Sequence, residues 1–155
     1  YNRVVKDLGD YTPETFLAKV SDIFAVTPGR LETSQKHHFE MYLGDSWYTL
    51  ATKEGSWDPN DPVERLDVSI LQTQLLKPLL GIEDPRRDKR IDFVGGIRGP
   101  QELEKRVAQG CAVAFKLCAT SIEELLAIAD AGEVMPPKST WFEPKLRDGL
   151  AVHLI

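Results

Sequence analysis

The fold of this chain is decided by residues 91–117, which read IDFVGGIRGPQELEKRVAQGCAVAFKL. Short apolar runs at 91–94 and 112–117 predict two β-strands, and the periodic segment 101–108 between them predicts a helix. Alternation of this kind favours a βαβ unit on a partly parallel sheet, because a helical crossover returns the chain in its original direction.

The alternation continues on both sides of this stretch. Downstream, a helix at 122–131 and a strand at 150–155 complete a C-terminal βαβαβ-like unit. Upstream, residues 1–6 predict another strand. Thr12 and Pro13 then predict the start of a helix, because threonine is a favoured N-cap and proline is tolerated in the first helical turn.

The middle of the chain contains a hairpin and a second helix. Residues 38–43 and 47–52 flank the Gly-Asp pair at 44–45, a combination that predicts a β-hairpin with a short turn. Leucines at helical spacing predict a helix over 68–80, which Pro78 is expected to kink or end. Together these segments predict the α/β class in its α+β form, a mixed β-sheet with flanking helices.

The composition allows a single domain over residues 1–155. The chain is 42% hydrophobic, which is enough for a substantial core, and its net charge is −5. This charge argues against capture of nucleic acid by the overall field of the protein. Lys77 and Pro78 interrupt the apolar stretch 75–82, so no membrane span is predicted.

The two cysteines indicate where the protein resides. Cys111 and Cys118 lie seven steps apart on one predicted strand, a separation of roughly 23 Å at the usual rise. A disulfide needs Cα atoms within about 7 Å, so these residues cannot bridge each other there. Free thiols favour a cytoplasmic localisation.

The turn after the strand at 91–94 is one candidate anion site. Gly95 and Gly96 allow a ligand to approach the backbone closely, and the following helix directs unpaired N–H groups toward an anion. Arg98 can add a bidentate contact to a phosphate or carboxylate. The alternative interpretation is a tight turn with a solvated arginine.

The second candidate lies in the long aperiodic segment 132–149, since long loops inside a compact domain are often functional. Its prolines restrict the backbone and favour a preformed site. Lys138, Ser139, Thr140 and Lys145 offer cations and hydroxyls that suit phosphate oxygens. The alternative is a proline-stiffened loop that covers the core.

Other side chains near this segment can take part in chemistry. Glu143 and Asp130 are candidate bases or magnesium ligands, and Trp141 is a candidate for stacking on a ring. Magnesium or a nucleotide therefore remains open as a cofactor. His37 and His38 are neighbours in a predicted strand and face opposite ways, so no protein metal centre is predicted.

Three segments resemble a known prokaryotic family. They are residues 1–7, residues 90–96, and the run ADAGEVMPPKSTWFEPKL at 129–146. The last two resemble the C-terminal signature of the domain-of-unknown-function family ten-fifteen, which is sometimes labelled as related to the partition proteins ParB and SpoOJ. Residues 1–7 resemble a mid-chain segment of the same family. The resemblance extends over essentially the whole chain.

The resemblance implies that part of the protein is absent. Full-length members carry an upstream half with a Gly-His-His-Arg motif, similar to that of ParB-like folds. Here His37 and His38 follow Lys36 and precede Phe39, so the motif is not present. The chain is therefore expected to be a C-terminal fragment whose N-terminal ParB-like half is missing.

The resemblance also implies a function. ParB-like folds support nucleotide binding and phosphorylation of free serine, and members of this bacterial family are often encoded beside serine-biosynthesis enzymes. The leading hypothesis is the C-terminal half of a metabolic enzyme that handles a small phosphorylated ligand, related to phosphoserine or serine. The full-length protein would perform phosphoryl transfer or phosphate-ester hydrolysis, and the fragment alone is expected to be inactive.

Two alternatives belong to other functional classes. A ParB-like DNA-binding or partition-associated protein would use the basic run at 86–90, although the acidic chain makes a solvated loop the simpler interpretation of that run. A non-catalytic interaction or dimerisation domain would expose an apolar patch and form a stable oligomer.

Overall fold

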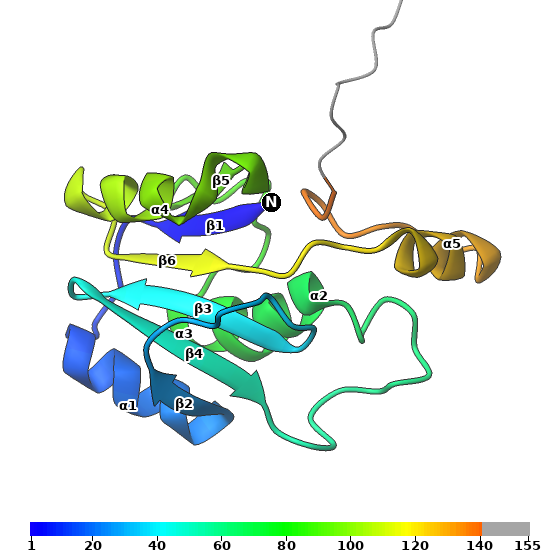
Figure 1. Ribbon diagram of the computed structural model, residues 1–155, viewed down its shortest axis with the longest axis horizontal. Helices are drawn as coiled ribbons and strands as arrows, with labels where there is room; N and C mark the ends of the chain where they lie inside the picture. The colour runs from blue at the N-terminus through cyan, green and yellow to red at the C-terminus, as the bar shows by residue number, and fades with distance from the viewer. Residues whose placement is uncertain (141–155) are drawn as a thin grey trace, which may run out of the picture.

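The computed structural model describes residues 1–140, and within them the strands form one sheet (Figure 1). The strands are β1 (Asn2–Val5), β2 (Phe24–Pro28), β3 (His38–Leu43), β4 (Ser46–Thr52), β5 (Ile91–Val94) and β6 (Val113–Lys116). The α-helices are α1 (Pro13–Ile23), α2 (Asp67–Leu71), α3 (Lys77–Leu80), α4 (Gly99–Ala108) and α5 (Ile122–Asp130). A π-helical turn, η1 (Gln72–Leu76), joins α2 to α3, and a 3-10 turn, η2 (Gly96–Arg98), precedes α4.

The sheet has six strands in the order β2-β4-β3-β6-β1-β5 within the described residues. Every pair of neighbours in it is antiparallel. The α+β class, the flanking helices and the hairpin are therefore confirmed. The predicted strand at 150–155 lies outside the described residues.

The parallel pairing that the sequence pattern favours does not occur between these strands. β5 and β6 do run in the same direction with α4 between them in the chain, because both pair antiparallel with β1. β1 lies between them and separates the two, so the βαβ unit is split by the first strand of the chain. Alternation along the sequence cannot reveal this insertion, because β1 is about ninety residues away from β5.

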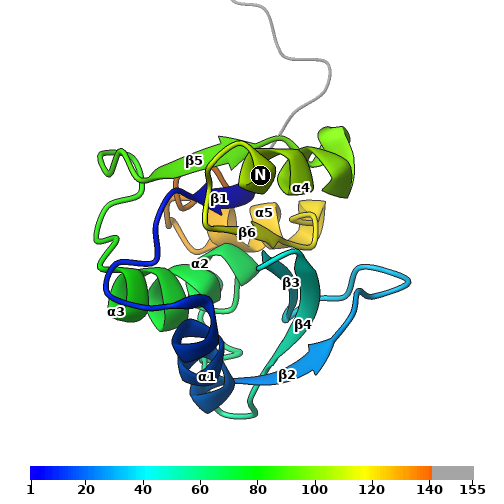
Figure 2. The same ribbon diagram turned by 90° about the vertical axis from the view of Figure 1, so that its left-hand side faces the viewer.

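The two faces of the sheet are covered by different helices. Val4 and Ala114 pack with Leu103 of α4 on one face. Their chain neighbours Val5 and Phe115 point the other way, into the larger core that α1, α2, η1 and α3 build. Figure 2 shows α4 and the α2–α3 segment on opposite sides of β1 and β6. The period of two along each strand therefore divides the core into two layers.

Helix α1 begins where the sequence predicts it and ends at Ile23. Thr12 forms a capping box with Thr15: the Thr15 N–H donates to Thr12 Oγ1 at 3.3 Å, and the Thr12 N–H donates to Thr15 Oγ1 at 2.9 Å. The apolar spacing of this helix extends to Phe24, but Phe24 begins β2 instead. Pairing of β2 with β4 replaces the last helical turn, a tertiary effect that local periodicity does not contain.

The cap of α1 gives a first prediction. Thr12→Ala removes a side-chain acceptor from the first helical turn, and we expect the free energy of unfolding to fall by about 1 kcal/mol. Urea denaturation followed by circular dichroism measures this change. Thr33→Ala, an exposed loop threonine, serves as the control and is expected to change nothing. Equal effects of the two substitutions would contradict the role of the cap.

The second predicted helix contains an irregular turn. Pro78 cannot donate to the carbonyl one turn earlier. The chain widens into η1 just before it, where the Lys77 N–H donates to the carbonyl of Gln72, five residues back. The helical path then continues to Leu80 and ends at Gly81, whose φ is 65°. Pro78 thus follows the widened turn, and the helix ends two residues later at Leu80.

Candidate functional site

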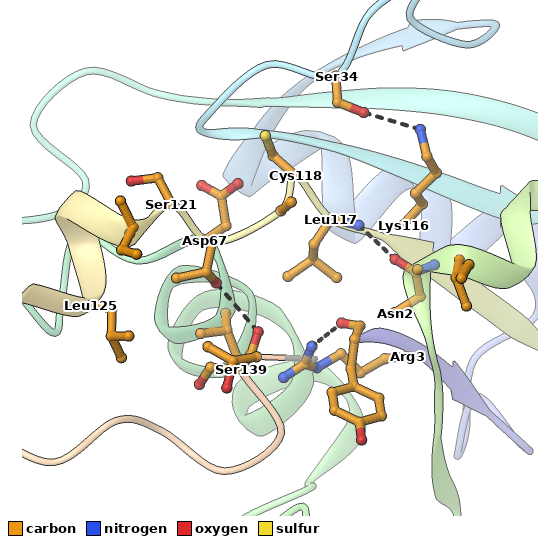
Figure 3. A pocket seen from close by; sticks show the side chains of 18 residues that line it. Asn2, Arg3, Ser34, Asp67, Lys116, Leu117, Cys118, Ser121, Leu125 and Ser139 are labelled. Carbon is orange, nitrogen blue, oxygen red and sulfur yellow. Dashed lines mark hydrogen bonds between the residues drawn. The ribbon is translucent and has the colours of Figure 1, made fainter. Parts of the chain in front are cut away.

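A cavity of about 550 Å³ lies at the end of the sheet where β5 and β6 finish and β1 begins (Figure 3). Its wall includes Gly96 and Ile97 after β5, and Ser139 and Thr140 of the proline-rich segment. The two candidate segments of the sequence analysis therefore border the same cavity. The start of α2 and the start of α5 complete the wall.

Arg3 supplies a buried positive charge to this cavity. The alternation of β1 places Arg3 on the same face as the core residue Val5, and its side chain and backbone together are only 3% exposed. The guanidinium donates to the carbonyl oxygen of Tyr1 and, at 3.2 Å, to that of Lys138. Its central carbon lies 5.4 Å from the centre of the Phe93 ring.

The charge of Arg3 has no carboxylate to balance it within residues 1–140, where no Asp or Glu oxygen lies within 4.0 Å of the guanidinium. Burial lowers the pKa of Arg3 to about 10, which still leaves it charged at neutral pH. A buried charge whose contacts are neutral carbonyls and an aromatic ring is costly to keep. An anion in the cavity would offset that cost.

Asp67, the first residue of α2, is the second buried charged side chain in the wall. It is 5% exposed, and its Oδ1 accepts the backbone N–H of His37 at 2.9 Å. His37 has a φ of 62°, a left-handed conformation from which its N–H reaches Asp67. Oδ2 is buried and has no hydrogen-bond partner among the described residues.

Burial also sets the electrostatics of Asp67. Desolvation raises the pKa of its carboxyl group, and the charge of Glu124 acts in the same direction. The hydrogen bond from the His37 N–H and the charges of Lys36 and His37 oppose this shift without cancelling it. Lys36 donates instead to the Glu124 carboxylate and, at 2.8 Å, to the carbonyl of Ala119. Among the described residues, only Oδ1 of Asp67 therefore has a hydrogen-bond donor.

Lys116 is the third charged residue of the wall, and a carboxylate already balances its charge. The Lys116 ammonium contacts the Glu40 carboxylate and donates to Ser34 Oγ at 3.2 Å. Glu40 is buried, and it also accepts from Arg30 Nε at 3.0 Å. One carboxylate thus lies between two cations. Lys116 is held in this network rather than directed at a ligand.

The thiol of Cys118 also borders the cavity. Both Cys111 and Cys118 are free, as the strand spacing predicts. Burial raises the pKa of the Cys118 thiol, with a smaller opposing effect from Lys36. A thiol with a raised pKa is a poor nucleophile at neutral pH. Cys118 therefore contributes shape to the wall rather than reactivity.

The structure places the predicted residues of the proline-rich segment in different environments. The Lys138 side chain is exposed, with its ammonium 5.6 Å from the centre of the Tyr1 ring, and it does not line the cavity. The Ser139 hydroxyl donates to the Pro136 carbonyl, which closes a local turn. Thr140 remains a wall residue. Lys145, Trp141 and Glu143 lie outside the described residues.

Of the site residues predicted after β5, some line the cavity and others are exposed outside it. Gly95 is buried, and Gly96 lies in the cavity wall, where an added Cβ would meet no atom within 4 Å. Arg98 is exposed outside the wall and pairs with Glu102 at 3.8 Å. Asp130 is exposed at the end of α5 and is also not a wall residue.

The basic run proposed for nucleic acid contact is paired with nearby acids. Arg86 contacts both carboxylate oxygens of Asp84 at 3.0 Å, which lowers the pKa of Asp84 to about 2. Arg90 contacts Asp88 in the same manner, at 2.7 Å for the shorter hydrogen bond. These pairs reduce the positive potential that a phosphate backbone would meet.

Sequence reasoning missed both Arg3 and Asp67. A signal for Arg3 was present, because a charged residue at a core-facing position of an apolar strand is unusual. Asp67 had no comparable signal. It resembles an ordinary acidic residue in a first helical turn, and its burial depends on the contact between α2 and the segment before β3.

Comparison with known proteins is consistent with part of the sequence analysis. Residues 1–69 match the model of a family described as a protein of unknown function (DUF1015). No curated protein and no solved structure matches the chain. The matched range contains Arg3 and Asp67 but excludes the run at 129–146 on which much of the resemblance rests. A relation to partition proteins and the place of the chain in a longer protein remain predictions.

The described residues contain neither a membrane-spanning helix nor a cluster of metal-binding side chains. No helix there is both long enough and apolar enough to cross a lipid bilayer. Within the same residues, no three side chains of histidine, cysteine, aspartate or glutamate are grouped as a metal centre would require. The cytoplasmic localisation remains a prediction.

Proposed function

We propose that this cavity binds the phosphate group of a small phosphorylated ligand, with Arg3 as its principal cation. The observation that carries the proposal is the 3% exposure of Arg3 beside a cavity, with no carboxylate to balance its charge in the described part of the chain. A guanidinium presents several N–H donors in one plane, a geometry that suits phosphate oxygens.

The rest of the wall fits an organic phosphate better than the free ion. The volume of about 550 Å³ lies within the range of small-molecule sites and exceeds what a phosphate ion alone would fill. Thr120 and Thr140 bring hydroxyl groups to the wall, while Val68, Leu117 and Leu125 bring apolar surface. Apolar surface in such a site favours a carbon-containing portion of the ligand.

This binding step supports the wider hypothesis of a metabolic enzyme. In that hypothesis the full-length protein carries out phosphoryl transfer or phosphate-ester hydrolysis on a compound related to phosphoserine or serine. This chain would position the phosphate group and stabilise its charge, and the upstream half would supply the catalytic base. Paired arginines at residues 86 and 90 make the DNA-binding alternative the weaker one.

The test is calorimetric titration with propyl phosphate. We expect Arg3→Gln to weaken binding roughly tenfold or more, because it removes a charge-assisted hydrogen bond to the anion. Arg3→Lys keeps the charge without the planar geometry, and its affinity is expected to fall between the two. Thermal melts of each variant show whether it folds.

Two cations that the sequence analysis predicted as anion ligands, Arg98 and Lys138, serve as controls. Arg98→Gln and Lys138→Ala alter exposed cations outside the wall, and both should leave the affinity for propyl phosphate unchanged. The proposal fails if folded Arg3→Gln binds as tightly as the wild type. It also fails if the wild-type protein does not bind propyl phosphate.

A further inference from the structure

We infer that the organic portion of the ligand contains an uncharged carbonyl group, and that the side-chain amide of Asn2 donates a hydrogen bond to its oxygen. The inference rests on the proposed phosphate site at Arg3. It makes Asn2 a residue that determines specificity, because a simple alkyl phosphate offers nothing to this amide. The ligand class is therefore a phosphate ester that also contains a ketone or amide oxygen.

Asn2 is a buried wall residue with an unused donor group. It is 4% exposed and lines the cavity. Its Oδ1 accepts the backbone N–H of Leu117 at 3.2 Å, and this bond identifies the oxygen of the amide, because a backbone N–H requires an acceptor. The other atom, Nδ2, therefore carries two N–H groups, and no atom of the described residues accepts a hydrogen bond from them.

The amide nitrogen is accessible from the cavity. Within residues 1–140, the buried side-chain atoms that are both unpaired and sealed from solvent belong to Asp67, Ser69 and Gln74, and none belongs to Asn2. Nδ2 is unpaired and therefore retains accessible surface. In Figure 3 the Asn2 oxygen faces the Leu117 N–H and the nitrogen lies on the other side of the amide. A ligand in the cavity can reach this nitrogen.

The neighbouring wall residue favours a group that only accepts hydrogen bonds. The antiparallel register of β1 and β6, continued by one step, brings Asn2 opposite Lys116. The Lys116 ammonium is itself a donor, held by Glu40 and by Ser34 Oγ. A carbonyl oxygen matches this pair of donors. A hydroxyl group would also need an acceptor for its own proton.

The charges in this part of the wall favour an uncharged acceptor over a carboxylate. The Asn2 amide is neutral, and the positive charge of Lys116 is balanced by the buried Glu40. A carboxylate would exchange its hydration for one neutral amide close to the charge of Glu40, which is unfavourable. A ketone or amide oxygen gives up far less hydration when it enters the same position.

Arg3 and Asn2 also determine how far apart the two ligand groups lie. Adjacent residues of a strand point to opposite faces of the sheet. Both nevertheless line one cavity, because it lies at the end of the sheet where β1 begins. Figure 3 shows the Arg3 guanidinium and the Asn2 amide in different parts of the wall. A ligand that contacts both needs a carbon chain between its phosphate and its carbonyl group.

The test compares carbonyl-containing phosphates with alkyl phosphates of the same shape. Hydroxyacetone phosphate and isobutyl phosphate form a short pair, and N-acetyl-O-phosphoethanolamine and isohexyl phosphate form a longer one. In each pair a methyl group replaces the carbonyl oxygen. In calorimetric titrations we expect wild-type protein to bind the carbonyl compound roughly fivefold more tightly in at least one pair, which is the scale of one hydrogen bond to an otherwise unpaired donor.

Asn2→Asp removes the donor and keeps the bond to Leu117, because a carboxylate oxygen can still accept that N–H. The ratio of affinities within each pair is the measured quantity, since the new charge weakens the binding of both phosphates. We expect the carbonyl preference to disappear. Asn60→Asp makes the same change on an exposed loop outside the wall and should leave the ratio as in the wild type.

A spectroscopic measurement observes the amide directly. Asn2 and Asn60 are the two asparagines of the chain, so selective isotope labelling of asparagine gives two side-chain amides. The signals that remain in Asn60→Asp belong to Asn2. In nitrogen–proton correlation spectra of the wild type, the preferred carbonyl compound should move the Asn2 proton signals downfield, and its alkyl partner should leave them nearly in place.

The outcomes separate this inference from the proposed function. If the alkyl phosphates bind and neither pair shows a preference, the assignment of Asn2 is overturned and the phosphate site stands. A preference that persists in Asn2→Asp, shown to be folded by its thermal melt, also overturns it. Unmoved Asn2 signals with the carbonyl compound bound do so whether or not that variant folds. If none of the four phosphates binds, the phosphate site itself is wrong, and the inference falls with it.

Discussion

Replacing Phe115 with alanine is expected to lower the free energy of unfolding by about 3–5 kcal/mol. Phe115 is fully buried in β6, opposite Met41 of β3 on one side and Arg3 of β1 on the other. The substitution leaves a cavity where the two halves of the sheet join. Urea denaturation followed by circular dichroism measures the loss.

The matched control is Phe93→Ala. Phe93 lies on the other side of Arg3 in the same register, but it is half-buried on the edge strand β5. Less apolar area is lost there, so we expect a cost of roughly 1–2 kcal/mol. Equal costs for the two phenylalanines would contradict the central position of β6.

Glu40→Ala is expected to cost about 3 kcal/mol of stability. Glu40 is buried between Arg30 and Lys116, so its removal leaves two cations without their common partner. Breaking a buried ion pair from one side usually costs about 3–5 kcal/mol. We expect the lower end, because the arginine is partly exposed and water can solvate it.

Two further measurements identify the origin of this loss. Glu83→Ala, which removes a carboxylate from an exposed pair with Lys77, should have no measurable effect on stability. In Glu40→Gln the Lys116 ammonium is no longer neutralised at the cavity wall, and propyl phosphate should bind several-fold more tightly. Unchanged stability in Glu40→Ala would show that the network contributes nothing.

The features that sequence reasoning predicted correctly are those that neighbouring residues determine. The hairpin turn requires positive φ at both central residues, and Gly44 and Asp45 have φ values of 55° and 61°. Helix α5 begins at a Ser121–Glu124 capping box that a short sequence window contains. In both cases the conformation that the local residues favour is the one found in the folded protein.

The features that it missed depend on contacts between distant segments. β2 forms because Phe24 and the residues after it pair with β4, about twenty-five residues further along. The insertion of β1 between β5 and β6 likewise has no local sign. Only the pairing of Asn2–Val5 with strands near residues 92 and 114 determines it.

The residues of the candidate site also differ in whether neighbouring residues or distant contacts determine their positions. The sequence predicted an anion site that includes Gly96 and Thr140, and both residues lie in the wall of one cavity. Lys138, also predicted for this site, is exposed and is not a wall residue, because a loop position in the sequence does not reveal which way a side chain points. Sequence reasoning overlooked Arg3, because an arginine inside a strand is usually assumed to face solvent.

The position of β1 has a consequence for how the chain reaches its folded state. Of the strands of this sheet, β1 is synthesised before the others, and the two strands that flank it follow roughly ninety and one hundred and ten residues later. Pairing between segments so distant in the chain is slow, because a long loop must close first. The strands on both sides of Arg3 are present only after most of the described chain has been synthesised. A peptide ending at residue 69 would contain the segment that matches the family model but neither strand that pairs with β1. The range that matches the family model and the range that must fold together therefore have different borders.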